Sequence, residues 1–223
     1  MKKQKGEKKM GTDKKKWIIF DAMGVVFSVG DDTNDLLVPF VQNYNNEITK
    51  EQINQIYMSA SLGHITSNEF WRKMEICKIG QEKEIEEKYL NSQLKIDDNF
   101  IQCVGRLKEK YHLALLSNDV SEWSDFLRKK FGLNDIFDIS IISGDVKLRK
   151  PDIKIYKKLL NEIKTEAFNC VYIDDREKNL IPALLLGMKC IKFIRDDEEL
   201  KTNNIKSISS FLELDKIIKK IWN

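Results

Sequence analysis

A short apolar run that breaks at a carboxylate constrains the fold of this chain more than any other feature. Residues 17–20 are branched or aromatic, Asp21 follows them, and Gly24 comes three residues later. Such a run is typical of a strand buried in a parallel sheet. Because open α/β sheets place their sites at the carboxyl ends of strands, Asp21 is a candidate site residue. From this segment alone, a cap on the following turn explains Asp21 equally well.

Two further segments carry polar residues that could act beside Asp21. An apolar strand over residues 113–116 ends at Ser117 and Asn118, whose hydroxyl and amide can either hydrogen-bond an anion or form a turn. In the stretch before the helical pattern 153–160, Pro151 keeps Lys150 out of the helical region. The Lys150 ammonium can therefore point inward, although a solvated loop lysine is the simpler interpretation of this stretch alone.

A third strand, over residues 171–173, ends in the adjacent carboxylates Asp174 and Asp175. Adjacent carboxylates repel each other, and a third one nearby adds to the cost unless a hard cation lies between them. Two solvated loop acids are the alternative if the other segments are unrelated.

Together these residues resemble the haloacid dehalogenase-like superfamily of hydrolases in their order and in their positions at strand ends. The resemblance covers residues 17 to about 195, and three phrases carry it: Ser117-Asn118-Asp119, residues 149–156 (Arg-Lys-Pro-Asp-Ile-Lys-Ile-Tyr), and Ile173-Asp174-Asp175 followed by Asn179, Ala183 and Gly187. It implies an α/β fold, with a doubly wound, Rossmann-like parallel sheet and a small α-helical cap inserted after the first motif.

The pattern of the chain predicts the same organisation. Strands at 17–20, 113–116, 139–142, 171–173 and 190–194 alternate with helices at 99–109, 121–131, 153–163 and 180–186, which favours a parallel sheet. Between them, helices are expected at 35–44, after Thr49 and Thr66, which open capping boxes, and at 83–90. We therefore expect a core of residues 17–27 and 98–223, a helical cap of residues 28–97, and a basic disordered tail of residues 1–16. An amphipathic pattern over 211–222 is expected to pack on the core.

Charge and composition bear on partners and location. The tail carries eight lysines against Glu7 and Asp13, a charge of +6, whereas the whole chain carries +3, which leaves −3 for the remainder. The core therefore shows no basic bias toward nucleic acid. No apolar run has membrane-spanning length, and the four cysteines lack metal-ligand spacing, so they are expected to be reduced. We expect a cytoplasmic monomer or homodimer that binds neither nucleic acid nor membranes, and the resemblance implies a small phosphorylated metabolite as its substrate.

The resemblance also implies a chemistry. Asp21 would be the nucleophile that forms an aspartyl-phosphate, with Lys150 as a second catalytic residue. Ser117, Asn118 and Lys150 would bind the phosphoryl oxygens. Asp21, Asp174, Asp175 and the backbone carbonyl of Met23 would bind Mg²⁺. Arg176 and Asn179 would support the site or begin the next helix.

The departure from the family pattern is Met23, because most phosphatases of the superfamily have an aspartate there that serves as acid and base. A thioether can do neither, and this role is worth roughly 10² to 10⁴ in rate. The first hypothesis is a slow or specialised Mg²⁺-dependent phosphatase that uses a good leaving group, a substrate hydroxyl or an acid from the cap. Asp31, Asp32 and His64 are candidates for that acid by position alone, although a surface, capping or loop role is the simpler interpretation of each. The second is a non-catalytic binding or regulatory protein. The third is a 2-haloacid dehalogenase-type hydrolase, which needs neither the acid nor a metal.

Overall fold

The computed structural model describes residues 16–92, 94–195 and 205–222. The predicted tail lies outside these ranges apart from Lys16. The carbonyl of Lys16 accepts a hydrogen bond of 3.0 Å from the backbone N–H of His112, which extends the pairing of the first strand by one residue.

The core is a six-stranded, wholly parallel sheet with the order β3-β2-β1-β4-β5-β6. The strands are β1 (Trp17–Phe20), β2 (His112–Ser117), β3 (Ile139–Ile142), β4 (Cys170–Asp174), β5 (Lys189–Phe193) and β6 (Lys206–Ile208). The chain winds from β1 outward to β3, then crosses to β4 on the other side of β1. The carboxyl ends of β1 and β4 therefore flank the point where the strand order reverses, which is where α/β sheets place their sites. The predicted fold class is confirmed.

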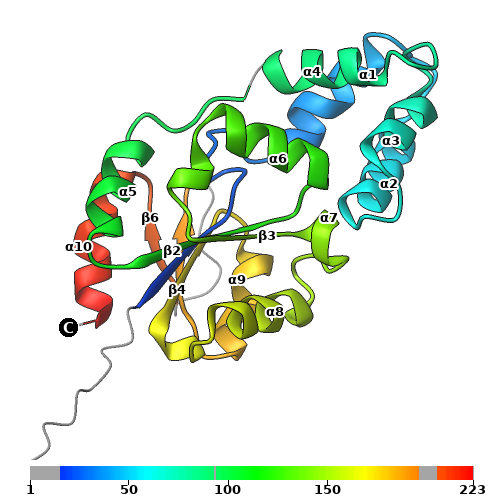
Figure 1. Ribbon diagram of the computed structural model, residues 1–223. Helices are drawn as coiled ribbons and strands as arrows, with labels where there is room; N and C mark the ends of the chain where they lie inside the picture. The colour runs from blue at the N-terminus through cyan, green and yellow to red at the C-terminus, as the bar shows by residue number, and fades with distance from the viewer. Residues whose placement is uncertain (1–15, 93, 196–204, 223) are drawn as a thin grey trace, which may run out of the picture.

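Helices cover both faces of this sheet (Figure 1). On one face, α5 (Phe100–Lys108), α6 (Ser121–Lys130) and α10 (Phe211–Trp222) pack against alternate strand residues such as Ile18 and Phe20. On the other face, α8 (Ile153–Ile163) and α9 (Glu177–Leu185) pack against the intervening residues such as Ile19. Short elements complete the core: η2 (Leu133–Asp135), α7 (Ser143–Val146) and η3 (Ala167–Asn169). Because side chains alternate across a strand, one apolar run supplies both layers.

A group of helices between β1 and α5 gathers at one end of the molecule, next to α6 and α7 (Figure 1). It contains η1 (Thr33–Leu37), α1 (Val38–Gln42), α2 (Lys50–Ser61), α3 (Ser67–Met74) and α4 (Glu82–Ser92). The predicted capping boxes at Thr49 and Thr66 are both present. The cap helices and α6 are joined by aromatic packing between Trp71 and Trp123. Glu86 Oε2 of α4 accepts hydrogen bonds from both indoles, from Trp71 Nε1 at 3.0 Å and from Trp123 Nε1 at 2.7 Å.

The two connections to the cap run side by side. Ser28 N–H donates to the carbonyl of Lys95 at 3.1 Å, and Asp97 N–H donates to the carbonyl of Val26 at 2.9 Å. The cap is thus tied to the core through a short paired stem. The boundaries at residues 28 and 97 stay a prediction.

Several elements differ from the sequence expectations, and the short elements η2, α7 and η3 were not predicted. The helix expected over 35–44 is a π-helical turn, η1, that passes into α1 near Pro39, a residue without the N–H that a continuous helix needs. Helix α9 begins at Glu177 rather than residue 180, and β6 was not predicted because three residues are too short for a clear pattern.

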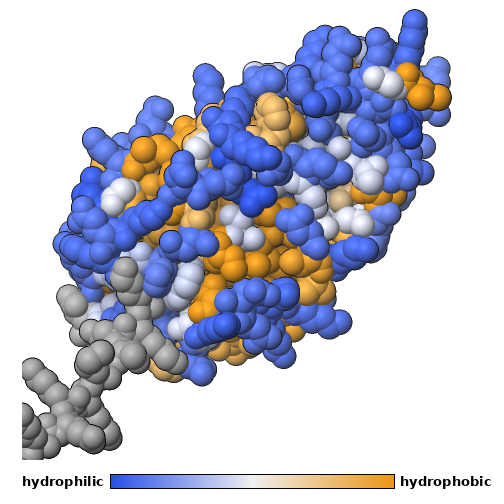
Figure 2. All heavy atoms as spheres, viewed as in Figure 1, coloured by the Kyte–Doolittle hydropathy of each residue, from blue (hydrophilic) through white to orange (hydrophobic). Residues whose placement is uncertain are grey.

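On the face in Figure 2, the surface is mostly hydrophilic, with apolar side chains concentrated in its central part. Among the described residues, no helix is long and apolar enough to cross a membrane.

Candidate active site

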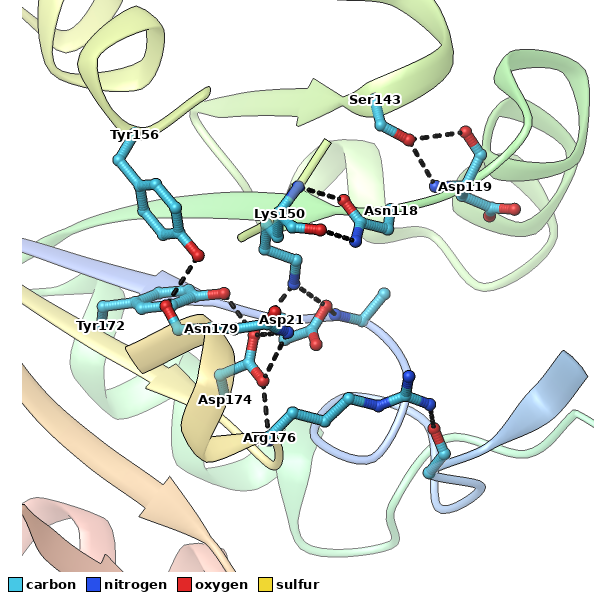
Figure 3. A network of polar contacts seen from close by, with 12 residues as sticks. Asp21, Asn118, Asp119, Ser143, Lys150, Tyr156, Tyr172, Asp174, Arg176 and Asn179 are labelled. Atoms are coloured by element: carbon cyan, nitrogen blue, oxygen red, sulfur yellow. Dashed lines mark hydrogen bonds and ion pairs between the residues drawn. The ribbon is translucent and has the colours of Figure 1, made fainter. Parts of the chain in front are cut away.

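Asp21, Lys150 and Asp174 meet at the carboxyl edge of the sheet (Figure 3). Asp21 follows β1 directly, Ser117 ends β2, and Asp174 ends β4. Lys150 lies in the loop between α7 and α8, before a cis peptide bond to Pro151. Parallel strands bring these residues together because all of them end at the same edge.

Lys150 lies between two carboxylates. Its Nζ is 2.7 Å from Asp21 Oδ1 and 2.9 Å from Asp174 Oδ2, and its side chain is 1% exposed. Burial by itself lowers the pKa of Lys150, but Asp174 and Asp21 outweigh it and raise that pKa above its usual value. The ammonium is therefore charged and points inward, and the solvated-loop interpretation of Lys150 is wrong.

Asn118 reaches the site, but its side chain already has partners. Its Oδ1 accepts from the backbone N–H of Lys150 at 2.8 Å, and its Nδ2 donates to the carbonyl of Lys150 at 3.0 Å. Both polar atoms of the amide hold the main chain of Lys150, so in this conformation the amide does not offer a free donor to a phosphate. The side chain of Asn118 thus positions the main chain of Lys150, and the expected contact of Asn118 with a phosphate stays a prediction.

We expect Asn118→Ala to destabilise the protein by about 1–3 kcal/mol, because the buried N–H and C=O of Lys150 lose their partners. The free energy of unfolding in urea measures the loss. Asn46→Ala, at an exposed position, is the matched control. Equal stability of the two variants would contradict the positioning role.

Asp174 is completely buried and held from several directions. Its Oδ1 accepts from the N–H of Arg176 at 2.8 Å and from Asn179 Nδ2 at 3.1 Å, and its Oδ2 accepts from the Tyr172 hydroxyl and from Lys150. Burial opposes ionisation, yet Lys150 and these hydrogen bonds hold the pKa of Asp174 below its usual range. The role of Asn179 as a supporting residue fits this arrangement. Tyr172 was missed, although residues 172 and 174 lie on the same face of the strand by the period of two.

Three carboxylates converge beside Lys150. One carboxylate oxygen each from Asp21, Asp174 and Asp175 lie within 4.8 Å of one another, and the buried Oδ1 of Asp175 has no hydrogen-bond partner. Burial and the charge of Asp174 raise the pKa of Asp21, and the same two causes raise the pKa of Asp175 to about 7. Gly24, at φ +76°, leaves room for Asp175, because a Cβ there would overlap its carboxylate. An orphaned oxygen in a ring of hard donors fits Mg²⁺.

A small pocket of about 40 Å³ opens above Asp21. Residues from the core and from the cap segment line it together: Asp21, Met23, Gly30, Asp32, Thr33, Tyr57, Ser117, Asn118, Arg149, Lys150, Arg176 and Asn179. Ser117 and Met23 thus lie where the sequence places them. Arg149 was not singled out from the sequence, although it directly precedes Lys150. Its guanidinium lies 5.4 Å from the centre of the Tyr57 ring and bonds Ser61 of the cap.

Of the three proposed acids, only one lines this pocket. His64 lies at a separate pocket beside Gly144. Asp31 accepts hydrogen bonds from Asn34 and lies 3.6 Å from Arg176. Asp32 lines the pocket with Asp21.

The chain belongs to the haloacid dehalogenase-like hydrolases, because the model of that family matches residues 18–193. It is 25% identical over 178 residues to a drimenol cyclase of Aspergillus calidoustus, covering 75% of this chain and 34% of the relative. It is 28% identical over 146 residues to a sesquiterpene phosphatase of Aspergillus oryzae, covering 57% of this chain and 74% of the relative. The fold is shared with a family enzyme of Bacteroides thetaiotaomicron that was solved with magnesium. The TM-score is 0.71 at 23% identity, and the match covers 85% of this chain and 98% of that enzyme.

Proposed function

We propose that this hydrolase is a Mg²⁺-dependent phosphatase that acts on a small phosphorylated metabolite through an aspartyl-phosphate on Asp21. The observation that carries the proposal is the cluster of three carboxylates around Lys150 with an orphaned Asp175 oxygen. The phosphatase name of a relative supports it. The drimenol cyclase is matched over about a third of its length, so its activity is no guide to this chain.

In this mechanism each residue has a task that its position allows. Asp21 attacks phosphorus, and Lys150, already 2.7 Å from Asp21, balances negative charge as the bond forms. Ser117, at the end of β2, hydrogen-bonds a phosphoryl oxygen. Asp21, Asp174, Asp175 and the carbonyl of Met23 would hold Mg²⁺, which when bound neutralises charge on the phosphoryl group.

The acidic cluster ranks the two other hypotheses lower. Halide leaves without a metal, so a dehalogenase has no use for a third carboxylate with an unpaired oxygen. A binding protein has no use for a nucleophile ion-paired to a buried lysine. Within the proposal we keep a cytoplasmic monomer or homodimer that binds neither nucleic acid nor membranes.

The test is hydrolysis of an aryl phosphate by the purified protein with Mg²⁺ or with EDTA. An aryl leaving group needs little protonation, so the assay reports on the nucleophile and the metal site rather than on the acid. We expect turnover with Mg²⁺ and none with EDTA. A folded protein that is silent in both conditions would overturn the phosphatase, and halide release from a 2-haloacid would be measured next.

Mg²⁺ should also raise the thermal midpoint, because a cation that binds only the folded state stabilises it by mass action. At a concentration 100 times the dissociation constant, the gain is about 2.7 kcal/mol. Asp175→Asn should reduce the shift, since it removes a charge from the cluster, whereas Asp98→Asn, at an exposed site, should not. Equal shifts in the two variants would place the cation elsewhere.

A further inference from the structure

Met23 leaves the proposed phosphatase without its usual acid, yet a carboxylate enters the same pocket from another segment. Asp32 lines the pocket that Asp21 and Met23 line, and it comes from the segment that leads into the cap. It precedes the π-helical turn η1, but its side chain makes no capping hydrogen bond to that helix. The carboxyl group is therefore not held by a capping hydrogen bond of the kind that an N-cap aspartate usually forms.

The surroundings of Asp32 suit a group that gives up and regains a proton. Its environment is largely desolvated, which raises its pKa to about 6; Asp31 adds to the rise, and Arg176, the backbone N–H of Thr33 and Arg149 oppose it. Further charges and titratable groups that act on this carboxylate come from α2, from α4 and from the loop after β2: Tyr57, Tyr89 and Asp119. A carboxyl near pKa 6 is a better acid-base catalyst at neutral pH than an exposed aspartate.

Its neighbour Asp31 is in a different position. Asp31 accepts two hydrogen bonds from Asn34 and lies 3.6 Å from Arg176. It lines a larger pocket, whose lining does not include Asp21. Burial raises its pKa, but the bonds from Asn34 prevail and lower it. Asp31 thus remains ionised and is a matched control of the same type, one residue away.

We propose that Asp32 is the general acid and base of this enzyme, in the role that Met23 cannot fill. The inference rests on the proposed phosphatase function. As Asp21 attacks phosphorus, the ester P–O bond breaks and the leaving oxygen takes the proton of the Asp32 carboxyl. The Asp32 carboxylate then takes a proton from water, whose oxygen attacks phosphorus. The bond from Asp21 to phosphorus breaks, and inorganic phosphate leaves with both aspartates restored.

The test compares two substrates in Asp32→Asn. An alkyl leaving group needs the proton and an aryl one does not, so kcat/KM for an alkyl phosphate should fall about 10² to 10⁴-fold while that for an aryl phosphate changes less than about 10-fold. With the aryl phosphate, the second step lacks its base. The phosphoenzyme should therefore accumulate and appear in the intact mass as one added phosphoryl group.

Controls distinguish a failure of the Asp32 role from a failure of the proposed phosphatase function. Asp31→Asn should stay within about 3-fold of wild type on both substrates, since Asp31 is outside the pocket of the nucleophile. The thermal midpoint verifies that each variant is folded. Wild-type protein that is silent on both esters overturns the phosphatase itself. An active wild type with an Asp32→Asn variant that keeps alkyl turnover, or loses both substrates equally, overturns the role of Asp32 alone.

The pH profile supplies a second readout. The first step needs Asp32 protonated, so kcat/KM for the alkyl phosphate should decline as pH rises through about 6, and Asp32→Asn should lose this limb. A limb that persists in the variant contradicts the assignment. So does a gain of about 10²-fold or more from Met23→Asp in otherwise wild-type protein, because it would show that no acid is in place.

Discussion

Asp21→Asn is expected to abolish phosphatase turnover, with a loss of about 10⁶-fold, the order seen when a covalent nucleophile is removed. The amide is nearly isosteric, but it cannot attack phosphorus, and its carbonyl is a weak partner for the Lys150 ammonium 2.7 Å away. The burial and repulsion that raise the pKa of Asp21 disappear with the charge, so the fold should tolerate the change. Initial rates on an aryl phosphate with saturating Mg²⁺ measure the effect.

Asp98→Asn makes the same chemical change at an exposed position and should keep wild-type rates. With enzyme in excess over the aryl phosphate, the wild type should release the phenol in a single turnover, and Asp21→Asn should not. If Asp21→Asn retains more than about one-hundredth of the wild-type rate, Asp21 is not the nucleophile.

Lys150→Met is expected to give the largest loss of stability, about 3–5 kcal/mol at neutral pH in EDTA. Removing one partner leaves uncompensated buried charge on the others, here Asp21 and Asp174. Without the ammonium the pKa of Asp21 rises further, and the pKa of Asp174 rises from its lowered value. The loss should therefore be full above these raised pKa values and shrink as pH falls and the carboxyls take up protons.

Urea unfolding at two pH values measures this dependence. Lys154→Met removes an exposed lysine a few residues away and should change the free energy of unfolding by less than about 0.5 kcal/mol. A Lys150→Met variant as stable as wild type at neutral pH would mean that the lysine does not balance the two carboxylates. Phosphatase activity should be lost in the same variant, because the attacking and transferred groups lose their neutralising charge.

With methionine at position 23, the proposed catalytic groups come from two parts of the chain. The nucleophile, the lysine and the acidic cluster belong to the core, whereas Asp32 and Tyr57 reach the same pocket from the cap segment. The acid would then come from the same segment that supplies Tyr57 to the pocket.

The class of fold was determined by the sequence because its signals are local. Apolar runs bounded by polar residues predict the strands, and the capping boxes at Thr49 and Thr66 predict where two cap helices begin. Helices α8 and α10 occur over the predicted ranges, since amphipathic periodicity is a property of consecutive residues. Each polar segment alone left a simpler alternative open, and it was the order of the segments, through its resemblance to the family, that predicted Asp21, Lys150 and Asp174 at one edge.

Contacts between segments far apart in the chain were decided only by the tertiary structure. Asn118 and Lys150 are 32 residues apart, and nothing local shows that the amide holds the main chain of the lysine. Likewise, position alone could not separate Asp31 from Asp32, two adjacent carboxylates. Their difference arises from burial and from Asn34 and Arg176 around them, because the pKa of a carboxyl depends on its surroundings in space and not on its place in the chain.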